Sequence, residues 1–264
     1  MTETQHPPDF DVRSFDGLRE IVRRLRAPDG CPWDRAQTHE SLRRYLLEET
    51  YETLEALDDG KPAKLREELG DVLLQILLHA QIASESGEFD VDGVIEGIAT
   101  KLLRRHPHVF GETRLDTAAE VVLKWEAIKS EERGGESLLA DVPQTLPSLA
   151  YSQALQERAV AAGFEWPRIE DVLDKLTEEA RELADAETLD EKREELGDTL
   201  FVLVSLARKL GLDAEESLRL ASRRFRRRFD RLQALAAERG LRLADLPIDA
   251  LESLWRETKP GSAR

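Results

Sequence analysis

Several residue types are scarce in this chain of 264 residues, and each shortage argues against a class of protein. Aromatic residues make up only 6%, and there are 15 glycines and 11 prolines, which argues against an all-β sandwich. The longest uninterrupted apolar run, residues 200–204, is far too short to cross a bilayer, so no membrane partner is expected. The single cysteine, Cys31, cannot form an internal disulfide, and the N-terminus is polar, which together favour a cytoplasmic protein.

The charge is strongly unbalanced, because 38 Lys and Arg residues face 54 Asp and Glu residues for a net charge of −16. A chain this acidic is a poor general binder of nucleic acid, since such binding depends on basic surface that releases counterions. The hydrophobic residues, at 41%, are sufficient for a packed core, so wholesale disorder is not expected.

Apolar residues recur at three- and four-residue steps along nearly the whole chain, as in Phe15, Leu18, Val22 and Leu25. Neither a βαβ alternation nor a glycine-rich phosphate loop is present in the sequence. The pattern therefore predicts an all-α protein. The expected helices are 15–26, 39–58, 63–86, 91–105, 117–133, 148–162, 169–186, 189–210, 214–239 and 248–258.

The two halves of the chain repeat one another. Arg-Glu-Glu-Leu-Gly-Asp at residues 66–71 recurs at 193–198, and a Glu-Glu-x-x-Glu motif precedes each copy. A tryptophan upstream, a basic helix downstream and a Trp-x-x-x-Lys motif complete each set, with equivalent positions 123–133 residues apart. Five features in one order predict a tandem duplication of helical modules. The expected parts are a tail (1–14), a first module (15–133), a Gly- and Pro-containing linker (134–147) and a second module (148–260).

Acidic residues of both motifs are predicted to share one site in each module. Residues three apart on a helix lie on one face, and helices joined by a short loop pack antiparallel, so the two motifs face each other. Apolar runs at 72–78 and 199–204 indicate that the second helix is buried there, and Gly70 and Gly197 suggest a close helix approach. The carboxylates are Glu49, Glu52, Glu68 and Asp71 in the first module, and Glu179, Glu182, Glu195 and Asp198 in the second.

A divalent cation would make such a cluster tolerable, because sheltered carboxylates without partners are costly in free energy. No basic residue is spaced to neutralise the face of Glu49 and Glu52 within its own helix. Hard oxygen ligands without His or Cys favour Mg²⁺, with Mn²⁺ as a substitute. The alternatives are a solvated acidic face, or a helical interaction or regulatory module whose acids pair with a partner protein.

Basic side chains are predicted to bind the phosphates of a nucleoside triphosphate. Lys101 and Arg105 are four residues apart on one helix face, as are Arg224 and Arg228. Nucleic-acid binding through the arginine-rich residues 223–228 is an alternative that the acidic net charge disfavours. Trp33, in a predicted loop, either stacks on a nucleobase or packs against the protein.

Four features together resemble the MazG family of all-α nucleoside triphosphate pyrophosphohydrolases in its two-module form. They are EExxE followed by ExxD, GCPWD at 30–34, RRHPHVF at 104–110 and WEAIKSEER at 125–133, and the resemblance covers about residues 15–260. It implies a homodimer that hydrolyses NTPs and dNTPs to monophosphate and pyrophosphate with Mg²⁺, removing aberrant or surplus nucleotides.

The resemblance also assigns roles to residues. The eight carboxylates become metal ligands, and nucleotide contacts carry over to Lys101, Arg105 and Lys129, and to Arg224, Arg228, Trp255 and Lys259. In the expected mechanism, water activated by the metal attacks the α-phosphorus. Glu48 and Glu178, about 100° around the helix from their neighbours, either orient this water or bind a group beside the metal. His106 and His108 are alternative bases, although a surface-loop or capping role is favoured because the second half lacks them. The second half also reduces GCPWD to GFEWP at 163–167, so the two modules are not expected to be equally active.

Overall fold

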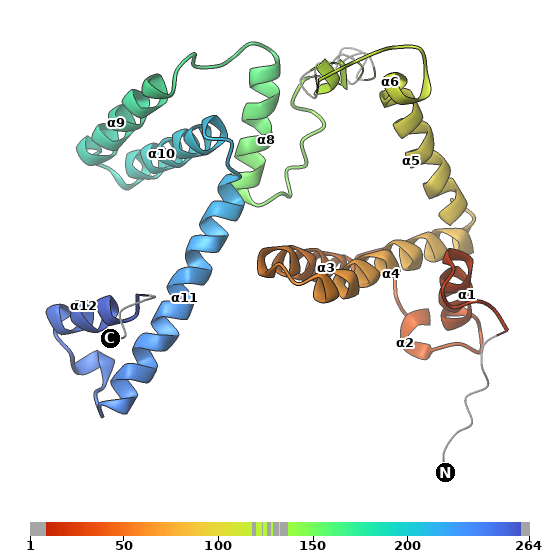
Figure 1. Cartoon of the computed structure of the whole chain (residues 1–264), viewed down its shortest axis with the longest axis horizontal. Coiled ribbons are helices and arrows are strands. Elements are labelled where there is room, and N and C mark those ends of the chain that lie inside the picture. The colour runs from red at the N-terminus through yellow and green to blue at the C-terminus, as the bar shows by residue number, and fades with distance from the viewer. Residues whose placement is uncertain are drawn as a thin grey trace. The chain divides into compact units, whose positions relative to one another are not determined.

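The computed structural model describes residues 9–117, 120–122, 124, 125, 128, 132 and 137–259. Packing divides the chain into two compact units, Met1–Glu120 and Val121–Arg264. Every element within the described ranges is a helix, which confirms the all-α prediction (Figure 1). No helix in these ranges is both long and apolar enough to cross a membrane. The expected helix 117–133 lies largely outside the described residues, and the module and linker boundaries stay predictions.

The first unit is built around the antiparallel pair α3 and α4, with α1 packed across α4 (Figure 1). The hydroxyl of Thr38 accepts the N–H of Ser41 at the start of α3, and Gly60 ends α3 in the left-handed region at φ 63°. Proline at the first position of α4 then sets the new helix. The helices are α1 (Phe15–Arg26), α2 (Pro32–Arg35), α3 (His39–Asp59), α4 (Pro62–Ser86), α5 (Val91–Arg105) and α6 (Pro107–Phe110).

The core of the first unit lies where α1, α3 and α4 meet. It joins Val22 of α1, Leu42 of α3 and Leu77 and Leu78 of α4, each at most 2% exposed. These residues come from the apolar stripes that the sequence shows at helical spacing, and their burial supplies the main stabilisation of the helix pair. The core therefore fixes α3 against α4, which positions the acidic side chains that both helices carry.

The second unit repeats this arrangement, with α9 and α10 as the antiparallel pair and α8 packed against α10. The amide of Gln156 on α8 donates to the carbonyl oxygen of Phe201 (2.8 Å) and accepts from the Ser205 hydroxyl (2.9 Å). Beyond the pair, α11 leads away and α12 packs near its far end (Figure 1). The elements are α8 (Ser148–Ala161), α9 (Ile169–Asp185), α10 (Leu189–Lys209), α11 (Ala214–Glu238), η1 (Leu243–Asp245) and α12 (Ile248–Glu257).

Three sequence-based expectations about local structure are wrong. Trp33 lies on the short helix α2 and not in a loop. The short helices α6 and η1 were not predicted either, because helices of three or four residues are too short to show an apolar period. A Cβ added at Gly70 or Gly197 would meet no described atom within 4 Å, so neither glycine marks a close helix approach within the chain. The second apolar run is buried on one side only, since Leu200 and Phe201 are 45% and 41% exposed.

Arg26 ties three segments of the first unit together. Its guanidinium forms two parallel hydrogen bonds with the Glu85 carboxylate of α4, at 2.8 and 2.7 Å. It also donates to the backbone carbonyl oxygens of Asp34, within α2, and of Gln37, which follows α2. The Arg26 side chain is only 6% exposed, so its hydrogen bonds replace water that cannot reach it.

Replacing Arg26 by methionine should therefore destabilise the first unit. The apolar stem is kept, but two backbone carbonyls and a carboxylate lose their donor, for an expected loss of about 2 kcal/mol in the free energy of opening. Hydrogen exchange of the α1 and α4 amides measures this loss. Arg23→Met is the control, because Arg23 is exposed in its pair with Glu20 and its loss should change exchange little. Equal exchange rates in the two variants would contradict the prediction.

Candidate metal centres

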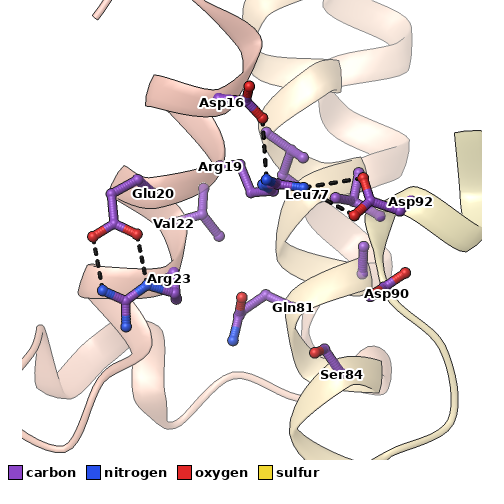
Figure 2. A pocket seen from close by; sticks show the side chains of 12 residues that line it. Asp16, Arg19, Glu20, Val22, Arg23, Leu77, Gln81, Ser84, Asp90 and Asp92 are labelled. Carbon is purple, nitrogen blue, oxygen red and sulfur yellow. Dashed lines mark hydrogen bonds and ion pairs between the residues drawn. The ribbon is translucent and has the colours of Figure 1, made fainter. Parts of the chain in front are cut away.

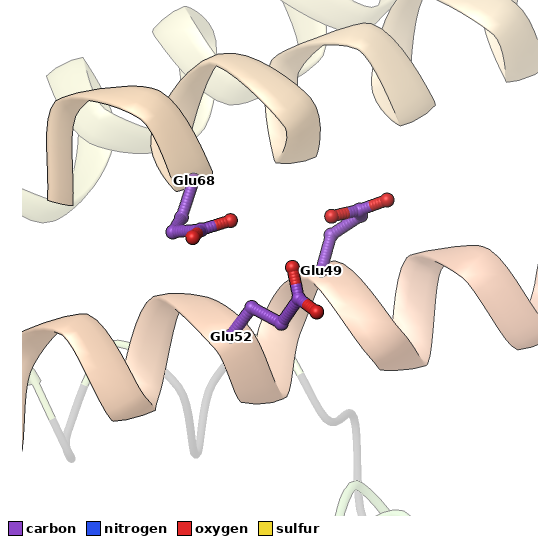
Figure 3. Close-up of side chains that lie close together, drawn as sticks. All are labelled: Glu49, Glu52 and Glu68. Atoms are coloured by element: carbon purple, nitrogen blue, oxygen red, sulfur yellow. The ribbon is translucent and has the colours of Figure 1, made fainter. Parts of the chain in front are cut away.

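Three carboxylates of the first unit converge between α3 and α4. Glu49 and Glu52 lie one turn apart on α3, and Glu68 faces them from α4 (Figure 3). Each offers an oxygen atom within 4.8 Å of the others. Glu68 is only 6% exposed, Glu49 is half-buried and Glu52 is exposed. The cluster is therefore buried at Glu68 and open to solvent at Glu52, where a ligand can enter.

Burial and mutual repulsion both disfavour the charged form of the carboxylates in this cluster. Burial raises the pKa of Glu49, and the nearby Asp71, Glu52 and Glu48 raise it further. Burial and the charge of Glu52 likewise raise the pKa of Glu68, although Lys64 opposes this. None of Glu49, Glu52 and Glu68 forms an ion pair with a described residue, so the carboxylates have no resident counter-ion.

The second unit contains the equivalent cluster. Glu179 and Glu182 lie one turn apart on α9, Glu195 faces them from α10, and their oxygens again lie within 4.8 Å of one another. Glu179 is 4% exposed. Burial, followed by the charges of Glu182, Glu179 and Asp198, raises the pKa of Glu195. The duplication seen in the sequence therefore reproduces the same site in three dimensions.

Asp71 and Asp198 lie beside these clusters but are not members of either three-residue group. Each is close enough to raise the pKa of a member, Asp71 that of Glu49 and Asp198 that of Glu195. Their expected role as fourth ligands stays a prediction.

The second cluster has a basic neighbour that was not among the predicted site residues. Lys175 Nζ lies 2.8 Å from Glu178 Oε1 and 2.8 Å from Glu179 Oε1. These hydrogen bonds raise the pKa of Lys175, so its ammonium stays charged at neutral pH. The signal was available, because Lys175 precedes these glutamates by three and four residues on one helix. The two predicted catalytic glutamates, Glu48 and Glu178, are both exposed. Glu178 is bound by Lys175, whereas the residue three positions before Glu48 is Tyr45.

Predicted phosphate-binding residues of the first unit lie on a helix that leads away from the acidic cluster. Lys101, which is exposed, and Arg105 lie on the C-terminal half of α5, and α5 extends away from the α3–α4 pair (Figure 1). Lys129 lies outside the described residues. A nitrogen of the His106 ring lies 2.7 Å from the carbonyl oxygen of Leu102 at the end of α5, as the capping interpretation expects.

In the second unit the predicted phosphate-binding residues form a basic pocket between α11 and α12. Arg228 lies over the Trp255 ring at 3.9 Å and donates to the Thr258 hydroxyl (3.0 Å) and the Trp255 carbonyl oxygen (2.9 Å). Arg224 lines the same pocket, of 640 Å³, and Lys259 is exposed after α12. The structure thus brings Arg224, Arg228 and Trp255 together, but α11 leads away from the α9–α10 pair that holds the acids (Figure 1).

Trp33 packs against the protein on one side and keeps part of its ring exposed, so it is consistent with both packing and stacking on a nucleobase. Its ring meets the Tyr45 ring edge-on, with centroids 5.7 Å apart and planes at 72°. The residue is nevertheless 51% exposed, which leaves ring surface accessible to a base. Tyr45 precedes Glu49 by one helical turn, so this aromatic pair belongs to the surroundings of the first cluster.

A separate cavity of 330 Å³ in the first unit lies between α1, α4 and the start of α5 (Figure 2). Arg19 bridges Asp16 and Asp92 across it, at 3.1 and 3.0 Å. Glu20 pairs with Arg23, and hydrogen bonds from Arg23 and Arg24 lower the pKa of Glu20 to about 2. Both arginines that line this cavity, Arg19 and Arg23, are already paired with carboxylates that line it as well.

Comparison with known proteins identifies the family. The sequence profile of the MazG nucleotide pyrophosphohydrolase domain matches residues 37–110 and 168–232, and each match contains one acidic cluster. The chain belongs to the MazG family. A Thermotoga maritima protein named nucleoside triphosphate pyrophosphohydrolase/pyrophosphatase MazG is 44% identical over 249 residues, 94% of this chain and 96% of that protein.

Two further proteins are similar to this chain. The nucleoside triphosphate pyrophosphohydrolase of Escherichia coli K12 is 41% identical over 257 residues, which cover 94% of this chain and 98% of that protein. The crystal structure of a MazG-related protein from Thermotoga maritima covers 44% of this chain and 98% of its own, with 30% identity and a TM-score of 0.39. The two-copy domain match agrees with the duplication that the sequence and both acidic clusters show.

The raised pKa values of Glu49, Glu68 and Glu195 predict how pH acts on the cation-free protein. Above the ordinary glutamate pKa the folded state keeps protons that the unfolded state has lost, so these groups lower stability as pH rises from about 5 to about 7.5. Added Mg²⁺ should therefore raise the unfolding temperature more at the higher pH. Thermal unfolding at both pH values, with and without Mg²⁺, measures this.

The control replaces Glu49, Glu68 and Glu195 together by glutamine. Burial and His39 lower the pKa of His79, which acts in the opposite direction over the same range, so the difference between wild type and variant is the quantity to compare. The wild type should lose stability relative to the variant as pH rises. A difference independent of pH would contradict the prediction.

Proposed function

We propose that this MazG protein hydrolyses nucleoside and deoxynucleoside triphosphates at the α–β bond, releasing a monophosphate and pyrophosphate. The proposal rests chiefly on the two repulsive carboxylate clusters, each within a matched MazG domain. Relatives at 41–44% identity over most of the chain are named for this activity. Removal of aberrant or surplus nucleotides in the cytoplasm is the corresponding cellular role.

Each cluster fits a magnesium or manganese ion. Its donors are hard carboxylate oxygens from two helices, without histidine or cysteine in either group. The raised pKa values of Glu49, Glu68 and Glu195 indicate negative charge that a cation would compensate. A bound divalent ion supplies positive charge that polarises a phosphoryl oxygen and lowers the pKa of a water molecule.

The protein's own groups have distinct tasks in this reaction. Glu49, Glu52 and Glu68 hold the cation in the first module, as Glu179, Glu182 and Glu195 do in the second. Glu48 and Glu178, on the adjacent face of the helix, orient the attacking water in line with the departing pyrophosphate. The guanidinium groups of Arg224 and Arg228 bind phosphate oxygens, with Trp255 and Lys259 beside them, as do Lys101 and Arg105 in the first module.

A homodimer is the second part of the proposal. Leu69 and Leu196 are 52% and 49% exposed beside Gly70 and Gly197, where the chain leaves open space. Apolar side chains at equivalent positions on both helix pairs favour burial against a second copy. The basic residues of α5 and α11 lie away from the acidic clusters of their own chain. In a dimer, the basic residues of a second copy could lie beside these clusters instead.

The activity is tested by incubating the protein with an NTP and Mg²⁺ and measuring pyrophosphate and orthophosphate separately. Glu52→Gln and Glu182→Gln each remove one ligand charge without changing side-chain size, so each should lower the rate in its own module by at least about a hundredfold. Glu40→Gln and Glu170→Gln, at the second positions of α3 and α9, are matched controls on the same helices and should retain the wild-type rate.

The result separates the proposal from its alternatives. Orthophosphate as the first product would exclude cleavage at the α–β bond. No hydrolysis by the wild type would instead favour a helical interaction module. A nucleic-acid binder would show affinity that falls steeply with salt and is lost when the basic residues 223–228 are neutralised.

The dimer is tested by sedimentation of variants at the two exposed leucines. Leu69→Asp and Leu196→Asp together place charge on the faces proposed to pair, so the protein should sediment as a monomer with its helical content unchanged. Phe164→Asp is the control, because Phe164 is 78% exposed on a loop. A wild type that sediments as a monomer, or a variant that remains dimeric, would contradict this pairing.

A further inference from the structure

Two histidines of the first unit form a contact that the proposed reaction does not use. His39 is the first residue of α3, and His79 lies in the C-terminal half of α4. Their Nδ1 atoms are 2.7 Å apart, and the planes of the two rings differ by only 6°. Two imidazole nitrogens at this distance form a hydrogen bond only when one carries a proton and the other does not. The contact therefore requires one proton between the two rings.

This contact tolerates a charge on one ring but not on both. A charged His39 can still donate to an unprotonated Nδ1 of His79, whereas two charged rings would place one N–H against the other. The second ring nitrogen of His79, Nε2, is buried and forms no hydrogen bond with a described residue, so a charged His79 would leave this donor without an acceptor. A charged His39 would also stand at the positive end of the α3 dipole.

Charged groups on the surrounding helices do not offset the repulsion between the rings. They are Arg26 on α1, Asp34 on α2, Glu40 and Arg43 on α3, Glu85 on α4 and Asp92 on α5. Arg26 is paired with Glu85, Asp92 is paired with Arg19, and Glu40 and Arg43 are exposed and opposite in charge. Burial and the charge of His39 lower the pKa of His79, and no described carboxylate opposes this.

The second unit has the same helix pair without the histidines. The equivalent positions, 130 and 127 residues further along, are Ile169 at the start of α9 and Leu206 on α10. The same two spacings relate Glu49 to Glu179 and Asp71 to Asp198. An antiparallel pair with apolar residues at these positions shows that the fold does not require the two imidazoles. The first unit therefore contains a titratable contact that the second lacks.

We propose that the contact between His39 and His79 is an acid-sensitive device of the first unit, in which one shared proton fastens the start of α3 to α4 and charging of both rings releases it. Leu42 lies one turn after His39, and Leu78 adjoins His79 in sequence; both belong to the core. Release of the contact therefore loosens the edge of the core that holds α3 against α4. The device does not depend on the metal centres.

The shared proton is tested by nitrogen-15 NMR of the imidazole rings in the full chain at pH 7.5. One ring of the pair should carry its proton on Nδ1 and the other on Nε2, because only opposite forms allow a hydrogen bond between the two Nδ1 atoms. His39→Ile and His79→Leu, made singly, identify the two rings among the five histidines of the chain. Protons on Nε2 of both rings would overturn the proposal.

Acid sensitivity is tested by hydrogen exchange of cation-free protein at pH 7.5 and pH 5, with rates corrected for intrinsic exchange. The lowered pKa of His79 means that the unfolded state takes up a proton more readily than the folded state, so stability falls as pH drops below the ordinary value of 6.5. Opening of the α3 and α4 amides should therefore increase on acidification, by at least about fivefold more in the wild type than in the double variant His39→Ile with His79→Leu.

The double variant gives the first unit the residues of the second at these two positions. It keeps Glu49 and Glu68, whose own titration is therefore common to both proteins, and the α9 and α10 amides should respond to pH equally in both. The same pH response of α3 and α4 in the wild type and the double variant would contradict the proposal. If the double variant does not fold, the NMR measurement on the wild type still decides whether the rings share a proton.

Discussion

Repulsion among carboxylates held between two packed helices is the constraint on which the site depends. Glu68 and Glu179 are at most 6% exposed, yet each faces two further glutamates within 4.8 Å. Such an arrangement persists only if the helix pair is fixed by other contacts, since the acids themselves push it apart. The apolar core where α1, α3 and α4 meet, and the Gln156–Ser205 hydrogen bond in the second unit, provide this support.

The two units have the same antiparallel helix pair, but different ion pairs stabilise it. In the first, Arg26 at the end of α1 binds Glu85 of α4, whereas in the second, Arg208 of α10 binds Glu165, which precedes α9. Both pairs join the second helix of the acidic pair to a neighbouring segment, with acid and base exchanged between the two. The position of the carboxylates is thus preserved although the contacts that stabilise it have been replaced, as expected when geometry rather than a particular contact is required.

The helices and the acidic clusters were predictable because both depend on local spacing. Apolar periodicity located the long helices to within about two residues, and two acids three apart on a helix share a face whatever packs beyond it. What Gly70 and Gly197 adjoin depends instead on tertiary contacts, and open space was found there. The separation of α11 from the α9–α10 pair depends on loop direction, for which the sequence has no periodic signal. Lys175 differs from these cases, because its spacing of four residues from Glu179 is visible in the sequence.

Arg228, in the basic pocket between α11 and α12, differs from Arg26 and Arg208 in the charge of its partners. Arg26 and Arg208 are held by carboxylates, which cancel their charge where it is buried. Arg228 is held by a hydroxyl, a carbonyl oxygen and the face of Trp255, and no described carboxylate pairs with it. These neutral partners fix the guanidinium in place without neutralising it. A guanidinium that is fixed in place and keeps its charge is suited to bind an anionic ligand such as a phosphate.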